Sequence, residues 1–398
     1  MSKAKQRTKA GCFTYAIDSH FVSHSAARGI EYELLHHFQL HFLSGLLSPV
    51  WNQTQFLEYR DQVMDLFLTV ASVKHAVLAS SASNKYMLSR DSRYEKLALG
   101  YYSQAVKEVN AALQELCSEQ TIPSNALLWG KDKHVNPSTH VAGAMALINA
   151  RLNHNPSSLS ITRAIDRVAL ESVIYQAFLL STGRPLTPSF FIHPRCLSRI
   201  ESLLEPAKSP QSSPILSLPL SLYRLIWDIV ELCHDPTHTE ERAIQHLALE
   251  LARWENSVLQ SNPTASPNPK SAESRHACFQ TLYVIAASIL FGWISGSLAV
   301  PLTMQFPVLA RSVLPTRLPP WQMRHALSLL NQPEVVDPWA QSFLAAWPIL
   351  IFGLAARSKG EAMLIRDVLV RMRDRMGYGF AQRTLGELEV EWRAKWKW

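Results

Sequence analysis

Paired cysteines, glycine and the sequence motifs of known catalytic sites are scarce or missing in this 398-residue chain. The five cysteines are far apart and form no C-x-x-C pair, so they predict no disulfide framework and indicate an intracellular protein. Only 14 glycines are present, and the dipeptides Asn-Gly and Asp-Gly do not occur, which leaves β-hairpins little turn chemistry. These absences favour helices.

Motifs for catalysis are also missing. The sequence has no H-E-x-x-H, no phosphate-binding G-x-x-x-x-G-K, no G-x-G-x-x-G and no G-x-S-x-G. The best pattern for a metal site is His37 and His41, one helical turn apart with His36 beside them. It has no evident third ligand, and surface or hydrogen-bonded histidines explain it better. We therefore predict no catalytic, cofactor-binding or metal-binding residues in the body of the chain.

Positive charge is concentrated at the N-terminus. The formal net charge is +7, and four of these charges come from Lys3, Lys5, Arg7 and Lys9. The rest of the chain carries about +3, too little to predict a broad nucleic-acid-binding face. The N-terminus also lacks the apolar run of a secretory signal.

One long uncharged segment covers residues 277–310, and within it 282–300 is long enough to cross a bilayer. Polar or small residues interrupt this run at Ser288, Ser295, Gly296 and Ser297, and Pro301 ends it. A helix buried on every side in a large helical protein has the same composition. We favour the buried helix and predict no membrane contact, with a protein anchored through 282–300 as the alternative.

Apolar residues recur at three- and four-residue steps along most of the chain, which predicts an all-α fold: a multi-helix bundle of antiparallel helices with proline-rich surface loops. Helices are predicted over 31–47, 61–88, 92–117, 140–152, 160–180, 339–356, from 361 to a break at 377–379, and over 384–396. The second and third of these predict an antiparallel pair. Connectors are predicted over 185–219, including a mobile surface loop at 208–213, and over 260–274.

Several tryptophans lie in helical apolar patterns. Core packing is the expected role for such residues, rather than an aromatic cage for a ligand. They are Trp227, Trp254, Trp293, Trp339 and Trp347.

The N-terminal residues Gly11 to Tyr15, behind the basic arm, resemble the opening of the fungal binuclear zinc cluster, in which a basic lead-in runs into G-C-x2-C-R-x5-C. Tyr15 stands where the second cysteine belongs, and no further cysteine occurs before Cys117. Structural zinc requires four ligands per ion, so this segment cannot hold two zinc ions and Cys12 is at most a vestigial ligand. A solvated, disordered basic tail is the alternative interpretation.

Most of residues 31–398 resemble the helical regulatory domain that follows the zinc cluster in fungal transcription factors. The resemblance depends on the order of many packing motifs, and it is most specific near the C-terminus. The motifs there are Ala346-Trp347-Pro348, Phe352-Gly353, Val368-Leu369 with Met372, the turn from Gly377 to Phe380, and Leu385, Leu388 and Trp392-Arg393.

This resemblance implies a basic arm at 1–30, remnant of a zinc-cluster DNA-binding motif, and a helical regulatory domain at 31–398. It implies a transcriptional regulator in the nucleus that contacts other transcriptional proteins, possesses a small-molecule effector site between helices, and controls a metabolic or secondary-metabolite gene cluster. DNA binding would be weak or indirect, with Lys5, Arg7 and Lys9 contacting phosphates. Zinc would be a cofactor only if a fuller gene model restored the missing cysteines.

Two features separate this chain from complete members of the family: the incomplete zinc cluster and the short segment that follows it. About fifteen residues separate Tyr15 from the first predicted core helix, too few for a dimerising coiled coil.

The remaining alternative is an all-helical enzyme or ligand-binding protein unrelated to transcription, which predicts a cluster of titratable residues with perturbed protonation in one pocket.

Overall fold

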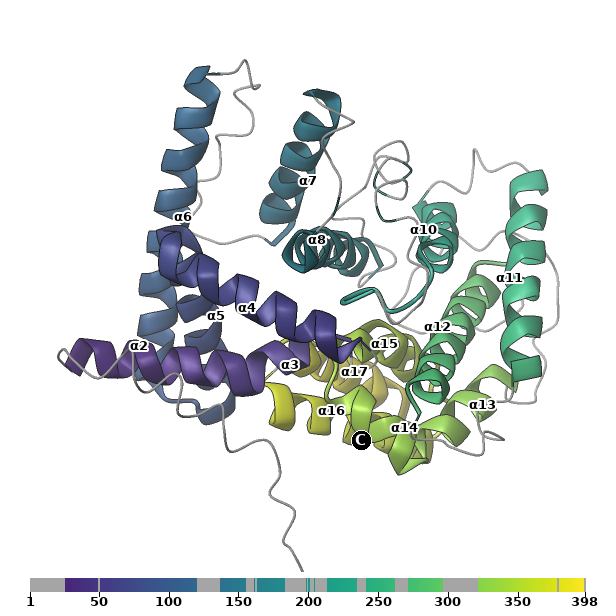
Figure 1. Cartoon of the computed structure of the whole chain (residues 1–398). Coiled ribbons are helices and arrows are strands. Elements are labelled where there is room, and N and C mark those ends of the chain that lie inside the picture. The colour runs from purple at the N-terminus through teal and green to yellow at the C-terminus, as the bar shows by residue number, and fades with distance from the viewer. Residues whose placement is uncertain are drawn as a thin grey trace, which may run out of the picture.

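The protein is described by a computed structural model that covers residues 26–48, 51–119, 137–154, 161, 163–182, 198, 200, 204, 213–234, 241–261, 271–295, 321–377 and 379–396. Every regular element within these residues is a helix, which confirms the all-α fold. Figure 1 shows a helical pair, α5 and α6, at one side, α10 to α13 at the other, and the C-terminal helices between them.

The N-terminal helix is continuous, but its middle turn is wider than an α-helix. It consists of α2 (Ala26–His37), the π-helical turn η2 (Phe38–Phe42) and α3 (Leu43–Leu46). The boundary residues His37, Phe42 and Leu43 all have right-handed helical φ and ψ, and the Leu43 N–H donates to the carbonyl of Phe38, five residues back. The helix predicted over 31–47 is therefore present, with its π-turn unforeseen.

The next two helices are α4 (Gln53–Thr69) and α5 (Ala71–Ser89), where the sequence predicted one helix over 61–88. That prediction is wrong at Val70, whose extended backbone (φ −122°, ψ 109°) bends the two helices by 116°. The backbone still makes its bonds on both sides, because Val70 N–H donates to Leu66 at 2.8 Å and its carbonyl accepts from Lys74 at 3.0 Å. The bend brings the buried side chains of both helices into one core.

Helices α5 and α6 (Ser92–Glu119) form the antiparallel pair that the sequence predicted (Figure 1). The turn between them is two residues long. Arg90 adopts the left-handed conformation (φ +60°) and its N–H donates to the carbonyl of Tyr86 at 2.7 Å. Asp91 then accepts from the Arg93 N–H at 2.9 Å, which satisfies a donor in the first turn of α6.

The middle of the chain contains α7 (Pro137–His154), α8 (Ala164–Thr182), α10 (Leu220–His234), α11 (Glu241–Ser261), α12 (Ala272–Ile294) and α13 (Trp321–Leu330). Among the described residues, α12 is the one unbroken helix long and apolar enough to cross a membrane. Its most apolar window is 83% buried, and its neighbours are α10, α11, α13 and α15. Burial in the protein core accounts for its lack of charge.

The C-terminal part contains α14 (Pro333–Ala340), the 3-10 turn η7 (Phe343–Ala345), α15 (Ala346–Ala355), α16 (Lys359–Met376) and α17 (Gly379–Trp396). The single helix predicted over 339–356 is wrong, because Ser342 is extended and its hydroxyl caps η7 by accepting from Leu344 N–H at 3.2 Å. The last helix begins at Gly379 rather than at the predicted Thr384. The predicted break at Gly377 is confirmed.

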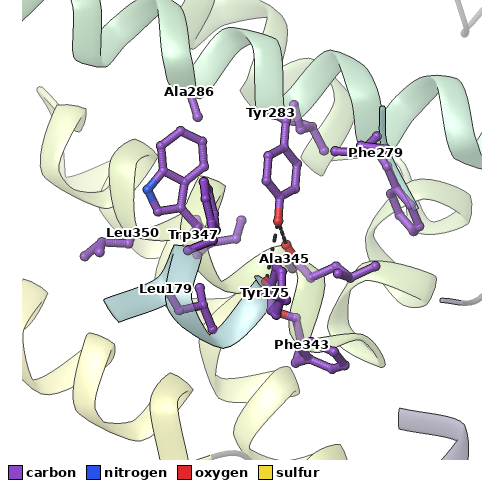
Figure 2. Close-up of a cluster of buried hydrophobic side chains, with 14 of the residues drawn as sticks. Tyr175, Leu179, Phe279, Tyr283, Ala286, Phe343, Ala345, Trp347 and Leu350 are labelled. Atoms are coloured by element: carbon purple, nitrogen blue, oxygen red, sulfur yellow. Dashed lines mark hydrogen bonds between the residues drawn. The ribbon is translucent and has the colours of Figure 1, made fainter. Parts of the chain in front are cut away.

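An aromatic cluster joins α8, α10 and α12 to the segment around η7 (Figure 2). The hydroxyl of Tyr175 donates to the carbonyl of Phe343 at 3.0 Å, and that of Tyr283 donates to the carbonyl of Leu344 at 2.8 Å. The Phe343 carbonyl also accepts from the Ala346 N–H, so the two tyrosines add side-chain donors at the start of α15. The break before α15 is thus stabilised by side chains from distant parts of the sequence.

The tryptophan predictions are confirmed where the structure describes the side chain. Trp293 and Trp347 are buried, and Trp227 and Trp254 are half-buried against the core. The side chain of Trp339 lies outside the described residues.

Part of the proline-rich connector is core rather than surface. Residues 213–218 are all buried, which corrects the expected surface loop at Ser213, while 208–212 lie outside the described residues. Glu171, itself 0% exposed, organises this segment by accepting from Ser213 Oγ at 2.7 Å and from the Ile215 N–H at 2.9 Å. Arg167 pairs with the other carboxylate oxygen at 2.8 Å.

Candidate functional site

A pocket of about 710 Å³ lies where three parts of the fold meet. Its walls come from the π-turn η2 with α3, from the facing sides of α5 and α6, and from the turn between α16 and α17. The apolar lining residues are Phe42, Leu46, Ala79, Met87, Ala98, Leu99, Phe343 and Met376. The polar and basic lining residues are His41, Ser80, Ser83, Asn84, Tyr102, Arg375, Gln382 and Arg383.

The π-turn determines which residues of the first helix reach this pocket. His41 and Phe42 belong to the turn and line the pocket, whereas Phe38 in the same turn is buried in the core. A π-turn adds one residue to the helical repeat, so it rotates the residues after it relative to those before it. Such turns are frequent at functional sites, and here the turn forms a wall of the pocket.

Asn84 of α5 connects the first helix to the end of α16. Its side-chain oxygen lies 2.8 Å from His37 Nε2, and its side-chain nitrogen donates to the carbonyl of Met376 at 2.5 Å. Burial lowers the pKa of His37 below its ordinary value, with the Asn84 bond opposing that change. The neutral form of His37 is therefore favoured in the folded protein.

The turn after α16 fits closely against α5. Gly377 has a left-handed backbone (φ +56°), and a Cβ atom there would lie 2.9 Å from Leu88 Cγ and 3.0 Å from the carbonyl oxygen of Asn84. On the opposite side, a Cβ on Gly45 of α3 would lie 2.6 Å from the Met376 methyl. These glycines allow the C-terminal helix pair to close one end of the pocket.

The electrostatic character of the lining is one-sided. Arg375, Arg383 and His41 line the pocket, and no aspartate or glutamate among the described residues does. Arg375 Nη1 lies 3.4 Å from Asp337 Oδ1, an oxygen that Arg371 also approaches at 3.8 Å. Arg383 is exposed on α17, and no acidic side chain among the described residues pairs with it. The pocket thus favours negatively charged groups.

Tyr102 of α6 lies at the edge of the pocket next to α7. Its hydroxyl is 2.6 Å from His140 Nε2, and burial raises the pKa of Tyr102 above its ordinary value. The hydroxyl therefore stays neutral. The pocket lining combines apolar side chains with polar and basic ones, a composition that suits the binding of a small molecule.

The histidines that formed the best metal pattern have other partners. The rings of His37 and His41 lie 5.2 Å apart, and His36 stacks on Tyr32 with ring centres 6.1 Å apart. Within the part of the chain that the structure describes, no three His, Cys, Asp or Glu side chains are grouped as metal ligands. His37 is instead a hydrogen-bonding residue, and His41 is part of the pocket wall.

The residues singled out at the N-terminus, Cys12, Lys5, Arg7 and Lys9, lie outside the described residues. The pocket itself was not predicted, because its walls come from segments more than 300 positions apart in the sequence. The signals that the sequence offered were Asn84, which follows the small and apolar residues 76–83, and the glycines that flank position 378.

One of three comparisons with known proteins, the comparison with protein families, matches almost the whole described structure. Searches of curated proteins and of solved structures each gave no match to this chain. The family described as fungal specific transcription factor domain matches residues 33–395. That range contains every residue that lines the pocket.

Proposed function

Because the chain belongs to the fungal-specific transcription factor domain family, we propose that it is a transcriptional regulator that acts in the nucleus through contacts with other transcriptional proteins. The observation that carries this proposal is the extent of the family match, from the first helix to the last. The proposal includes control of a metabolic or secondary-metabolite gene cluster. Regulation, rather than catalysis, is the activity that membership of this family implies.

The proposed route to DNA is indirect. In the sequence as it stands, Cys12 is the one cysteine at the position of a zinc cluster, and structural zinc needs four ligands per ion. Lys5, Arg7 and Lys9 would contribute phosphate contacts that position a protein without reading sequence. A partner protein would then supply most of the sequence-specific DNA binding, unless coding sequence after codon 14 restores the missing cysteines.

The pocket is the proposed site for a small effector. It lies between the first helix, which directly follows the basic arm in the sequence, and the last two helices. A ligand there would contact η2, α5, α6, α16 and α17 at once. Its binding would therefore change the relative stability of arrangements in which these helices are closer together or further apart.

Tethering tests the regulatory role. The full chain is fused to an unrelated sequence-specific DNA-binding domain and expressed in fungal cells with a reporter gene that carries the matching site. We expect the fusion to accumulate in the nucleus and to change reporter expression several-fold relative to the DNA-binding domain alone. Reporter expression equal to that control, or exclusion from the nucleus, would contradict the proposal.

A gel-shift measurement tests the indirect route to DNA. The purified chain should bind DNA weakly, without sequence preference, and less at higher salt, because phosphate contacts release counterions. Replacing Lys5, Arg7 and Lys9 with glutamine should abolish this binding. Arg366→Gln, at an exposed position of α16, should leave it unchanged. Sequence-selective binding that requires added zinc would show that our interpretation of Tyr15 is wrong.

A further inference from the structure

We propose that the pocket binds a small amphipathic anion, such as an aromatic or branched aliphatic carboxylate, whose charged group lies between Arg383 and Arg375. This inference names the class of effector and rests on the proposed function for what binding does in the cell. The binding itself depends on the pocket alone.

The charge of the lining supports an anion. Arg383 lies on α17 at the pocket and is not engaged in an ion pair with a described side chain, and its Nη1 would lie 3.6 Å from a Cβ placed on Gly379. Arg375 approaches from α16, and His41 from the first helix. Because none of the described residues that line the pocket is acidic, a bound carboxylate meets hydrogen-bond donors there.

The remainder of the lining supports an apolar body. Ala79 and Ala98 are small residues on the facing sides of α5 and α6, and they leave space between these helices. Leu99 is 63% exposed, a large apolar surface that a ligand would cover. Phe42 and Phe343 add aromatic surface from two other elements. Burial of such surface contributes about 25 cal/mol for each Å² removed from water.

The size and charge of the pocket favour a small molecule over a segment of protein. Its volume of about 710 Å³ falls within the range of small-molecule sites. The basic arm of this same chain, with Lys3, Lys5, Arg7 and Lys9, has the same sign of charge as the pocket and is a poor occupant.

Asp337 limits the affinity for anions. Its carboxylate pairs with Arg375 and with Arg371, so in the free protein part of the positive charge at the pocket is already neutralised. A ligand must compete with this carboxylate for Arg375. Removing the charge of Asp337 therefore leaves Arg375 available for the ligand and should strengthen binding.

Two probes of the same shape test the proposal on the purified full chain: 2-naphthoate, which is an anion, and 2-naphthamide, which is neutral. Their dissociation constants are measured by ligand-observed NMR or calorimetry. We expect naphthoate to bind about tenfold more tightly than naphthamide, the factor that a single charge-assisted hydrogen bond supplies. Its binding should weaken as salt is added.

Variants locate the binding. Arg383→Gln should weaken naphthoate about tenfold and leave naphthamide unchanged, and Asp337→Asn should strengthen naphthoate two- to threefold, at about the energy of an exposed ion pair. The control is Arg366→Gln on α16, because Arg366 pairs with Glu389 and does not line the pocket. Thermal unfolding midpoints near that of the wild type show that each variant is folded.

Several results would overturn the inference: no binding of either probe, equal binding of both, or naphthoate binding that does not respond to Arg383→Gln. Binding of an acidic peptide at Arg383 without binding of naphthoate would assign the pocket to a protein partner instead. These outcomes do not depend on the tethering experiment. If the fusion regulates the reporter but the chain does not bind naphthoate, the proposed regulatory function stands and the proposed ligand class is wrong. If the chain binds naphthoate but the fusion does not regulate the reporter, the ligand class stands and the regulatory function is wrong.

Discussion

Gly377 is the residue whose replacement tests the turn between α16 and α17 most directly. Alanine there must adopt a left-handed backbone, and its Cβ would lie 2.9 Å from Leu88 Cγ and 3.0 Å from the Asn84 carbonyl oxygen. Strain of this kind costs about 1–3 kcal/mol, so we expect Gly377→Ala to lower the free energy of unfolding by that amount. Denaturant unfolding of the two proteins measures the difference.

The matched control is Gly386→Ala on α17, where a new Cβ would meet nothing within 4 Å. This change should stabilise the protein by up to about 1 kcal/mol, because alanine is the better helix former. If both alanine variants had the same stability, the packing described around Gly377 would be wrong.

Glu171 provides a second test at the scale of a residue. Glu171→Gln keeps the shape of the side chain but replaces one carboxylate oxygen with an NH2 group. That NH2 group must then face another donor, either the Arg167 Nε–H or the donors of the 213–217 segment. A buried donor without a partner costs about 1–3 kcal/mol, and we expect a loss of stability of that size. Glu95→Gln, at an exposed site on α6, should change the unfolding midpoint little.

These two residues differ in how far the sequence alone could predict them. The glycines that flank position 378 indicate a break between helices, and the structure has that break at Gly377. Glu171 lies in a helix like many other acidic residues, and its role depends on Ser213 and Ile215, which are more than 40 positions away. Local pattern carries no information about such partners, so nothing in the sequence singled out Glu171.

At the scale of elements, the sequence predicted many of the helices, but it did not predict α10, α11, α13 and α14 or the interruptions at Val70 and before α15. Val70 is neither glycine nor proline, and the bend there keeps the backbone hydrogen bonds on both sides, so no local signal marks it. The break before α15 did have a signal. Pro348 lacks an N–H and is tolerated in the first turn of a helix, which places the start of α15 near Ala346 rather than at Trp339.

The packing of α15 on α17 offers a prediction for a pair of elements. A Cβ on Gly353 would lie 2.3 Å from Leu388 Cδ1, and the carbonyl of Gly353 accepts from Trp392 Nε1 at 2.9 Å. Gly353→Ala should therefore force α17 outward or displace the leucine, at a cost of about 1–3 kcal/mol.

A double-mutant cycle separates this contact from other effects. Leu388→Ala alone should cost about 2–5 kcal/mol, because the leucine is fully buried. In the double variant the alanine at 353 occupies space that the leucine vacated, so the two losses should sum to more than the loss measured together. Additive losses would mean that the helices do not touch at this point.

At the scale of the whole molecule, the all-α class, the family and most of the helix positions follow from the sequence, and the pocket does not. Periodic apolar residues determine a helix and the side it buries. They do not determine which helices become neighbours in space, and the pocket exists because η2 and α3 meet α16 and α17. Family membership adds the fold and the regulatory role, but no ligand.

Acid sensitivity is the property of the whole molecule that three half-buried histidines predict. Burial is the largest influence on His37, His276 and His325, and it lowers the pKa of each from the ordinary 6.5. Two of them also have a buried ring nitrogen without a hydrogen-bond partner, Nδ1 of His276 and Nε2 of His325. The folded protein therefore favours the neutral form of all three rings.

The sign of the effect follows from proton binding. Near and below pH 6.5 the unfolded chain binds protons at these histidines and the folded chain does not, so stability is complete above that pH and is lost as the pH falls toward the lowered pKa values. Burial raises the pKa of Glu171, which acts on stability in the opposite sense at more acid pH, so the comparison must be between variants.

Urea unfolding midpoints of the wild type should change little from pH 8 to 7 and fall from 7 to 5.5. In the variant with His37→Gln, His276→Gln and His325→Gln this loss of stability at acid pH should be smaller, because glutamine binds no proton. An equal loss in both proteins would contradict the neutral state of these half-buried rings.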